Sequence, residues 1–102
     1  MLIWISFLIP SIYTHVPLYF AKLGDLTGAQ NALSKLDVSA QLQAVEYYRL
    51  AVTAEIMANR TNALEFLGQA IKAGYPMNEI TNDPELKELR QDIAYHKLLA
   101  QN

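Results

Sequence analysis

The segment GDLTGAQNAL, residues 24–33, is matched further along the chain by the segment ANRTNALEFL, residues 58–67. The paired positions are Thr27 with Thr61, Ala29 with Ala63, Leu33 with Leu67 and, just beyond, Leu36 with Ala70. A fixed period of this length is typical of stacked supersecondary units that bury their apolar faces against one another. The match therefore predicts a repeat fold, and repeat folds build surfaces for partners more often than active sites.

Helical periodicity surrounds both matched segments. Between residues 29 and 36 the apolar positions fall at i, i+3, i+4 and i+7, on one face of a helix. Short polar side chains cap helix starts, and glycine ends helices because it adopts the left-handed conformation without strain. The pattern predicts helices over residues 18–23, 28–36, 40–58 and 62–73. Their expected caps are Thr27, Asp37 with Ser39, and Thr61, and their expected stops are Gly24, Gly74 and Pro76.

The C-terminal region carries helix signals of its own. Asp83-Pro84-Glu85 is a strong start, because Asp accepts backbone N–H groups, Pro suits the first helical position and Glu complements the positive helix end. Asp92 is the expected cap of a last helix over residues 93–99. The expected apolar stripe is Leu86, Leu89 and Ile93. No stretch alternates like a strand, so the sequence predicts an all-α fold of antiparallel helix–turn–helix units.

Large and small residues follow a fixed order in the second unit: Tyr47, Leu50, Ala51, Ala63, Leu67 and Ala70. In this order and spacing, residues 44–76 resemble a tetratricopeptide repeat, which implies a fragment of an α-solenoid. Two departures are Ala54, which stands where the family has tyrosine, and Pro76, which falls one residue late. In the preceding unit Pro17 stands where the family has glycine, which predicts a kinked or incomplete first helix.

A second pattern covers the tail: AGYP at residues 73–76, DPELKELRQD at residues 83–92, then Tyr95 and Leu98-Leu99. It resembles a terminal segment that follows the last repeat in many bacterial proteins of the same superfamily. The resemblance implies that this segment is a cap over the last apolar face, as repeat stacks require. We therefore expect an N-terminal segment over residues 1–17, a repeat region over 18–76 and C-terminal capping helices over 77–102.

The N-terminal stretch MLIWISFLIPSIYTHVPLYF, residues 1–20, contains no Asp, Glu, Lys or Arg. Three interpretations stay open. The segment is a buried helix of an incomplete first repeat, a membrane anchor whose apolar run is interrupted by proline and polar residues, or a signal peptide that lacks a positive start.

Composition excludes several function classes. The net charge is −2, and the eight Lys and Arg residues are spread along the chain, so nucleic-acid binding is not expected. The absence of cysteine excludes disulfides and thiolate chemistry. The two histidines are His15 and His96. Asp92 lies four residues before His96, and this spacing favours a surface hydrogen bond on a helix over a metal site. No catalytic residue, metal site or cofactor is predicted, and the acidic row Glu85, Glu88 and Asp92 is expected to be a solvated face.

The repeat resemblance implies a partner-binding groove on the inner face of the helix over residues 40–58. The residues expected there, called the groove face below, are Val45, Tyr48, Arg49, Val52, Glu55 and Ile56. The groove would suit an apolar or helical segment. The competing interpretation is that another helix of the same chain, such as residues 1–20, covers this face.

These patterns predict a non-enzymatic protein–protein interaction module, whose partner is another protein, a peptide or a second copy of the chain. The alternative is a membrane-tethered adaptor of the same repeat type, anchored through residues 1–20. We expect a cytoplasmic location for the first and membrane association for the second.

Overall fold

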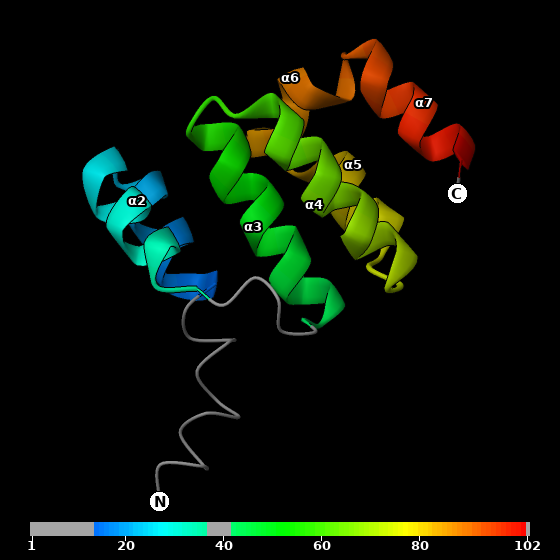
Figure 1. The fold of residues 1–102 in the computed structure, drawn as a ribbon. Helices are drawn as coiled ribbons and strands as arrows, with labels where there is room; N and C mark the ends of the chain where they lie inside the picture. Colours follow the sequence, from blue (N-terminus) through cyan, green and yellow to red (C-terminus); the bar gives the residue numbers. More distant parts are fainter. Residues whose placement is uncertain (1–13, 37–41, 102) are drawn as a thin grey trace, which may run out of the picture.

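The computed structural model describes residues 14–36 and 42–101, and the regular structure of these residues is entirely helical (Figure 1). The expected all-α fold is therefore confirmed. Residues 14–22 form a helical stretch that continues through Pro17. It is followed by α2 (Leu26–Ser34), α3 (Ala44–Ile56), α4 (Arg60–Lys72), α5 (Met77–Asn82), the 3₁₀ turn η1 (Pro84–Leu86), α6 (Lys87–Arg90) and α7 (Ile93–Gln101).

Several expectations fall on residues outside this description. They include most of the N-terminal segment, residues 1–13, and the caps Asp37 and Ser39. Among the described residues, no helix has the length and apolar character needed to cross a membrane.

The turn before α2 begins with a left-handed residue and continues directly into a helix cap. Gly24 has a φ of +83°, and the N–H groups of Gly24 and Asp25 donate to the carbonyls of Ala21 and Phe20 at 3.0 and 2.9 Å. These two bonds are those of a Schellman helix end. Asp25 then caps α2, because its Oδ1 accepts from the Gly28 N–H at 2.9 Å.

The turn between α3 and α4 repeats these bonds at the matched positions. Ala58 has a φ of +63°, and the N–H groups of Ala58 and Asn59 donate to the carbonyls of Glu55 and Ala54 at 3.0 and 2.8 Å. The Oδ1 atom of Asn59 accepts from the Asn62 N–H at 3.2 Å and caps α4. The two hairpin turns, one repeat period apart, therefore share one local structure.

The prediction that Thr27 and Thr61 are the caps of these helices is wrong. Both lie in the first turn of their helix, because the cap stands earlier in the chain, at Asp25 and Asn59. A Schellman bond at each of these positions places the Asp or Asn side chain where it can accept the first unpaired N–H groups.

The helix α3 begins at Ala44, later than the expected start at residue 40. The Gln43 N–H donates to Glu46 Oε1 at 2.9 Å, which is the reciprocal half of a capping box. Leu42 and Gln43 are not helical.

The C-terminal segment, residues 77–101, folds back on the α3–α4 pair. Asp83 starts η1 as expected, because its Oδ1 accepts from the Glu85 N–H at 2.9 Å. A short helix, α5, precedes it and was not predicted. Arg90 holds this connection closed by donating from Nη1 to the carbonyls of Ile80 and Asp83 at 2.8 and 2.6 Å.

The core lies between α3, α4 and the C-terminal segment. Its largest fully buried side chains include Leu67, Ile80, Leu86 and Leu89. Burial of one such side chain stabilises the fold by about 1.5–3 kcal/mol. Ile93, which was expected in the apolar stripe of the tail, is instead 70% exposed, because the chain turns at Asp92 before α7 begins.

Candidate partner-binding surface

All six residues of the groove face lie on α3, but the C-terminal segment occupies part of that face. Val52 is buried in one cluster with Ile80, Leu86 and Leu89. Tyr48 and Ile56 are partly buried against the same cluster. Val45, Arg49 and Glu55 are also partly buried. The chain's own C-terminal segment therefore covers the part of the groove face formed by Val52, Tyr48 and Ile56.

Tyr48 contacts two residues beyond α4, and the second of them, Asp83, belongs to the C-terminal segment. Its ring stacks on Tyr75 with centroids 4.3 Å apart and planes inclined by 17°. Its hydroxyl donates to Asp83 Oδ2. Partial burial, together with the nearby carboxylate of Glu79, raises the pKa of the Tyr75 phenol above its ordinary value.

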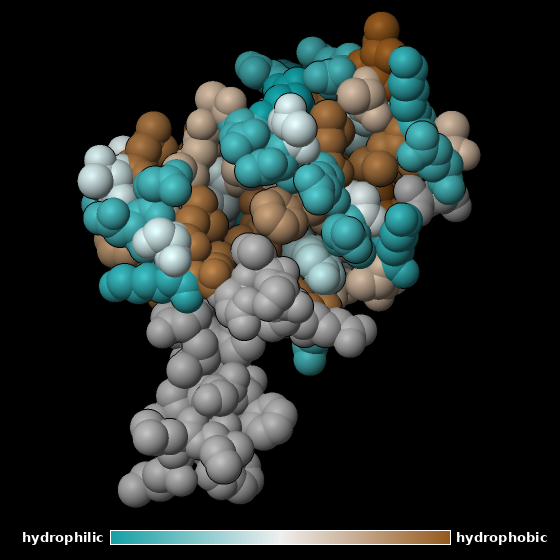
Figure 2. All heavy atoms as spheres, in the orientation of Figure 1, coloured by the Kyte–Doolittle hydropathy of each residue, from teal (hydrophilic) through white to brown (hydrophobic). Residues whose placement is uncertain are grey.

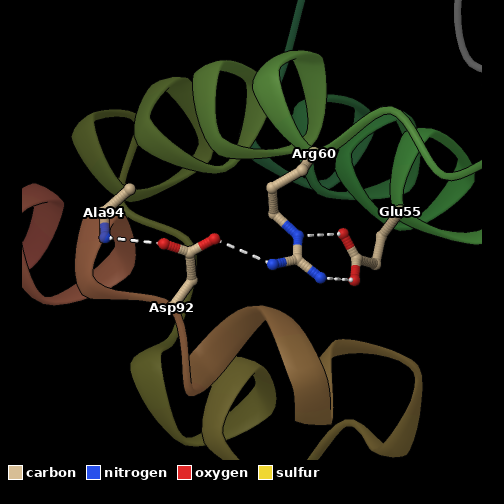
Figure 3. Close-up of polar contacts among 4 residues, drawn as sticks. All are labelled: Glu55, Arg60, Asp92 and Ala94. Atoms are coloured by element: carbon tan, nitrogen blue, oxygen red, sulfur yellow. Dashed lines mark hydrogen bonds and ion pairs between the residues drawn. The ribbon is translucent and has the colours of Figure 1, made fainter.

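The Glu55 carboxylate forms an ion pair with Arg60, the first residue of α4. Arg60 donates from Nε to Oε1 and from Nη2 to Oε2 of Glu55, both at 2.7 Å (Figure 3). The Glu55 side chain is only 9% exposed. This fork-shaped pairing fixes the geometry of both groups and raises the pKa of Arg60 above its ordinary value.

The same arginine reaches the C-terminal segment. Arg60 Nη1 donates to Asp92 Oδ2 at 2.9 Å, while Asp92 Oδ1 accepts from the Ala94 N–H at 2.9 Å and caps α7 (Figure 3). The Ala94 N–H and the Arg60 guanidinium lower the pKa of Asp92 below its ordinary value. Arg60 thus ties the α3–α4 turn to the start of α7.

Part of the groove face borders a shallow, mixed-charge hollow. Glu55 and Ile56 lie beside η1 and α6 there, and the space measures about 360 Å³. Its other lining residues are Pro84, Glu85, Lys87 and Glu88. Glu85 and Glu88 of the predicted acidic row are exposed here, whereas Asp92 is engaged by Arg60.

A second hollow lies between α2 and the α3–α4 pair, and sequence reasoning missed it. This interhelix hollow measures about 320 Å³. Its apolar lining consists of Leu33, Leu36, Leu50, Ala54, Met57 and Phe66. Figure 2 shows hydrophobic residues gathered along the line where α2 faces α3, with hydrophilic residues on either side. The signal in the sequence was Ala54, a small residue at a position where the repeat pattern has a large one.

Metal chemistry finds no support in the described part of the chain, where no group of His, Asp and Glu residues could hold an ion. Asp92 binds the Arg60 guanidinium and the Ala94 N–H. The His96 ring packs edge-on against the Tyr95 ring, with the two ring centroids 5.7 Å apart.

Comparison of the chain with protein-family models, with curated proteins and with solved structures finds no match.

Proposed function

We propose that this chain is a non-enzymatic protein–protein interaction module built from tetratricopeptide-like helical hairpins. The observation that carries the proposal is the recurrence of one hairpin turn at the two matched positions of the sequence. Gly24 and Asp25 make the same backbone bonds and the same cap as Ala58 and Asn59. A locally repeated turn supports a repeated hairpin, and repeated hairpins present extended surfaces to other proteins.

The C-terminal segment supports the same function. It covers the apolar side of α3 and α4 through Ile80, Leu86 and Leu89, which are fully buried. An open repeat would leave that surface exposed to non-specific association. With this end covered, the surface around α2 and the helical stretch over residues 14–22 offers exposed apolar side chains to a partner.

A second copy of the chain is one such partner. Tyr19 and Leu23 are 59% and 64% exposed, and Leu26, just after the turn, is 48% exposed. Large apolar side chains this exposed favour association when they gather at one site. Sedimentation equilibrium checks this point: Leu23→Lys should shift the full chain toward monomer, whereas a wild-type chain that is monomeric at high micromolar concentration contradicts self-association.

Selection of peptide ligands tests the general function. The full chain is immobilised, a random peptide library is panned against it, and isothermal titration calorimetry measures the dissociation constants of the recovered peptides. We expect peptides that share a sequence pattern and bind more tightly than scrambled versions. Peptides without a common pattern, binding no better than their scrambled forms to a chain shown helical by circular dichroism, would contradict the proposal.

A further inference from the structure

The interhelix hollow has the size and lining of a binding pocket. Its volume of about 320 Å³ lies at the lower end of the range of ligand pockets. Leu50 and Ala54 form a buried part of its wall, with 1% and 7% of their surfaces exposed, and Leu33, Met57 and Phe66 are partly buried around it. An apolar group bound here would therefore be transferred from water to an apolar environment.

The polar lining of this hollow is neutral. Its three polar residues are Gln30, Asn59 and Asn62, all exposed, and no Asp, Glu, Lys or Arg lines it. A charged ligand would lose hydration here without gaining a partner charge. A side-chain amide both donates and accepts hydrogen bonds, as a peptide group does. Because Asn59 Oδ1 already accepts from the Asn62 N–H, Asn59 would offer its NH₂ group to a ligand.

We propose that the interhelix hollow binds a partner polypeptide through an uncharged segment that inserts a large apolar side chain. The side chain fills the space beside Ala54, and the adjoining peptide groups bond to the amides of Gln30, Asn59 and Asn62. The inference rests on the proposed function and specifies the surface and the chemistry of the partner. An uncharged segment is the complement of a lining that has an apolar floor and a neutral, amide-bearing rim.

The direct test is a titration of the ¹⁵N-labelled full chain with a peptide of matching chemistry. The probe is a hexapeptide with blocked ends, in which two central leucines are flanked by glutamines and then serines. We expect amide shifts concentrated at residues of the interhelix hollow. A matched peptide with alanines for the leucines, and another with glutamates for the glutamines, should each bind on the order of tenfold more weakly. Shifts confined to other surfaces, or no shifts at all, would overturn the inference.

Two variants of the chain separate this hollow from other binding surfaces. Ala54→Leu fills the space, so the leucine peptide should bind this variant on the order of tenfold more weakly than wild type. A larger core residue can disturb packing, so a second test changes exposed positions only. The double variant Gln30→Glu with Asn62→Asp should reduce the affinity of the leucine peptide by a similar factor. Gln101→Glu, an exposed change at the end of α7 and outside the lining of the hollow, is the control and should bind the peptide as tightly as wild type does.

The outcome also distinguishes this inference from the general function. If peptides selected from the library bind Ala54→Leu and the double rim variant as tightly as wild type, the hollow is not the binding site, while the interaction function stands. If the library yields no sequence-selective peptide, and the leucine probe does not bind, both fail.

Discussion

Ala58 adopts the left-handed backbone conformation that Gly24 adopts at the matched position of the first hairpin, and each is followed by an Asx side chain that caps the next helix. The two residues differ in what this conformation costs. Glycine has no Cβ and takes a positive φ freely, whereas an alanine in the left-handed region is strained by about 1–2 kcal/mol. The second hairpin therefore keeps a turn that its own sequence disfavours.

Replacing this alanine should stabilise the chain. Ala58→Gly removes the strain at a φ of +63°, and we expect the free energy of unfolding to rise by about 0.5–1 kcal/mol after the greater entropy of unfolded glycine is subtracted. Urea denaturation followed by circular dichroism measures the change. Gly24→Ala is the matched control and should destabilise by a similar amount. A lower midpoint for Ala58→Gly would show that the turn does not have this conformation in solution.

The two roles of Asp92 can be separated by substitution. Asp92→Asn keeps an oxygen for the Ala94 N–H but removes the charge that faces Arg60, whereas Asp92→Ala removes both contacts. We expect urea midpoints to fall in the order wild type, Asp92→Asn, Asp92→Ala. Asp25→Asn retains a cap oxygen at the position equivalent to Asn59 and should stay near wild type. Equal midpoints for Asp92→Asn and wild type would show that the contact with Arg60 contributes no stability.

Acid should weaken the attachment of α7. The pKa of Asp92 is lower in the fold than in the unfolded chain, because the Ala94 N–H and Arg60 stabilise its charged form. Such a group stabilises the fold above the unfolded pKa of about 3.9, and this contribution is lost as the pH falls through the folded value. We expect the unfolding free energy of Asp92→Asn to fall less steeply than that of wild type below about pH 4. Parallel slopes for the two proteins would contradict the assignment.

The hydroxyl of Tyr48 should stabilise the contact between α3 and the C-terminal segment. Tyr48→Phe keeps the ring that stacks on Tyr75 but removes the bond to Asp83, so we expect a loss of about 1–2 kcal/mol in unfolding free energy. Tyr47→Phe is the neighbouring control, since the structure shows no bond from its hydroxyl to another described residue. A double-mutant cycle with Asp83→Asn should show that the two changes are not additive. Additive losses would mean that the two groups do not interact in solution.

Gly68 sets how closely α7 approaches α4. A Cβ at this position would lie 3.0 Å from Leu98 Cδ1. Alanine can be accommodated by a small movement of the leucine, whereas Gly68→Leu should displace α7 and cost about 1–3 kcal/mol of unfolding free energy. Hydrogen exchange of the α7 amides should rise selectively in this variant. The exposed change Gln69→Leu is the control, and unchanged α7 protection in Gly68→Leu would show that the helices do not meet there.

The helices could be predicted well from the sequence where the signal was local. Gly24 and Gly74 end helices as expected, and Asp83 and Asp92 begin them, because one residue and its neighbours decide these features. The sequence predicted Thr27 and Thr61 as caps and missed Asp25 and Asn59. In each turn the left-handed residue that ends one helix is followed directly by the residue that caps the next, so the cap comes two residues earlier than predicted. The short helix α5 was missed because Pro76 indicated an end and gave no sign of the start that follows it.

The candidate site depended on contacts that no local pattern encodes. From the sequence, the groove face could be open to a partner or covered by another helix of the chain, with residues 1–20 as the example. In the structure Val52 and Tyr48 meet Leu86 and Tyr75, which lie far along the chain beyond α4. The interhelix hollow arises from Ala54 together with Leu33 and Phe66 on two other helices. A small residue in a helix predicts close packing and empty space equally well, so only the arrangement of the helices decides between them.

Native-state hydrogen exchange tests most directly whether the C-terminal segment is an integral cover of the groove face. We expect the amides of Tyr95 and Val52 to open with the same free energy and the same dependence on urea, because their side chains share one buried cluster and the Tyr95 N–H is bonded to the Asp92 carbonyl at 3.0 Å. Tyr95 exchanging through a low-energy, urea-independent opening while Val52 stays protected would show that the segment is only loosely attached. The groove face would then again be open to a partner.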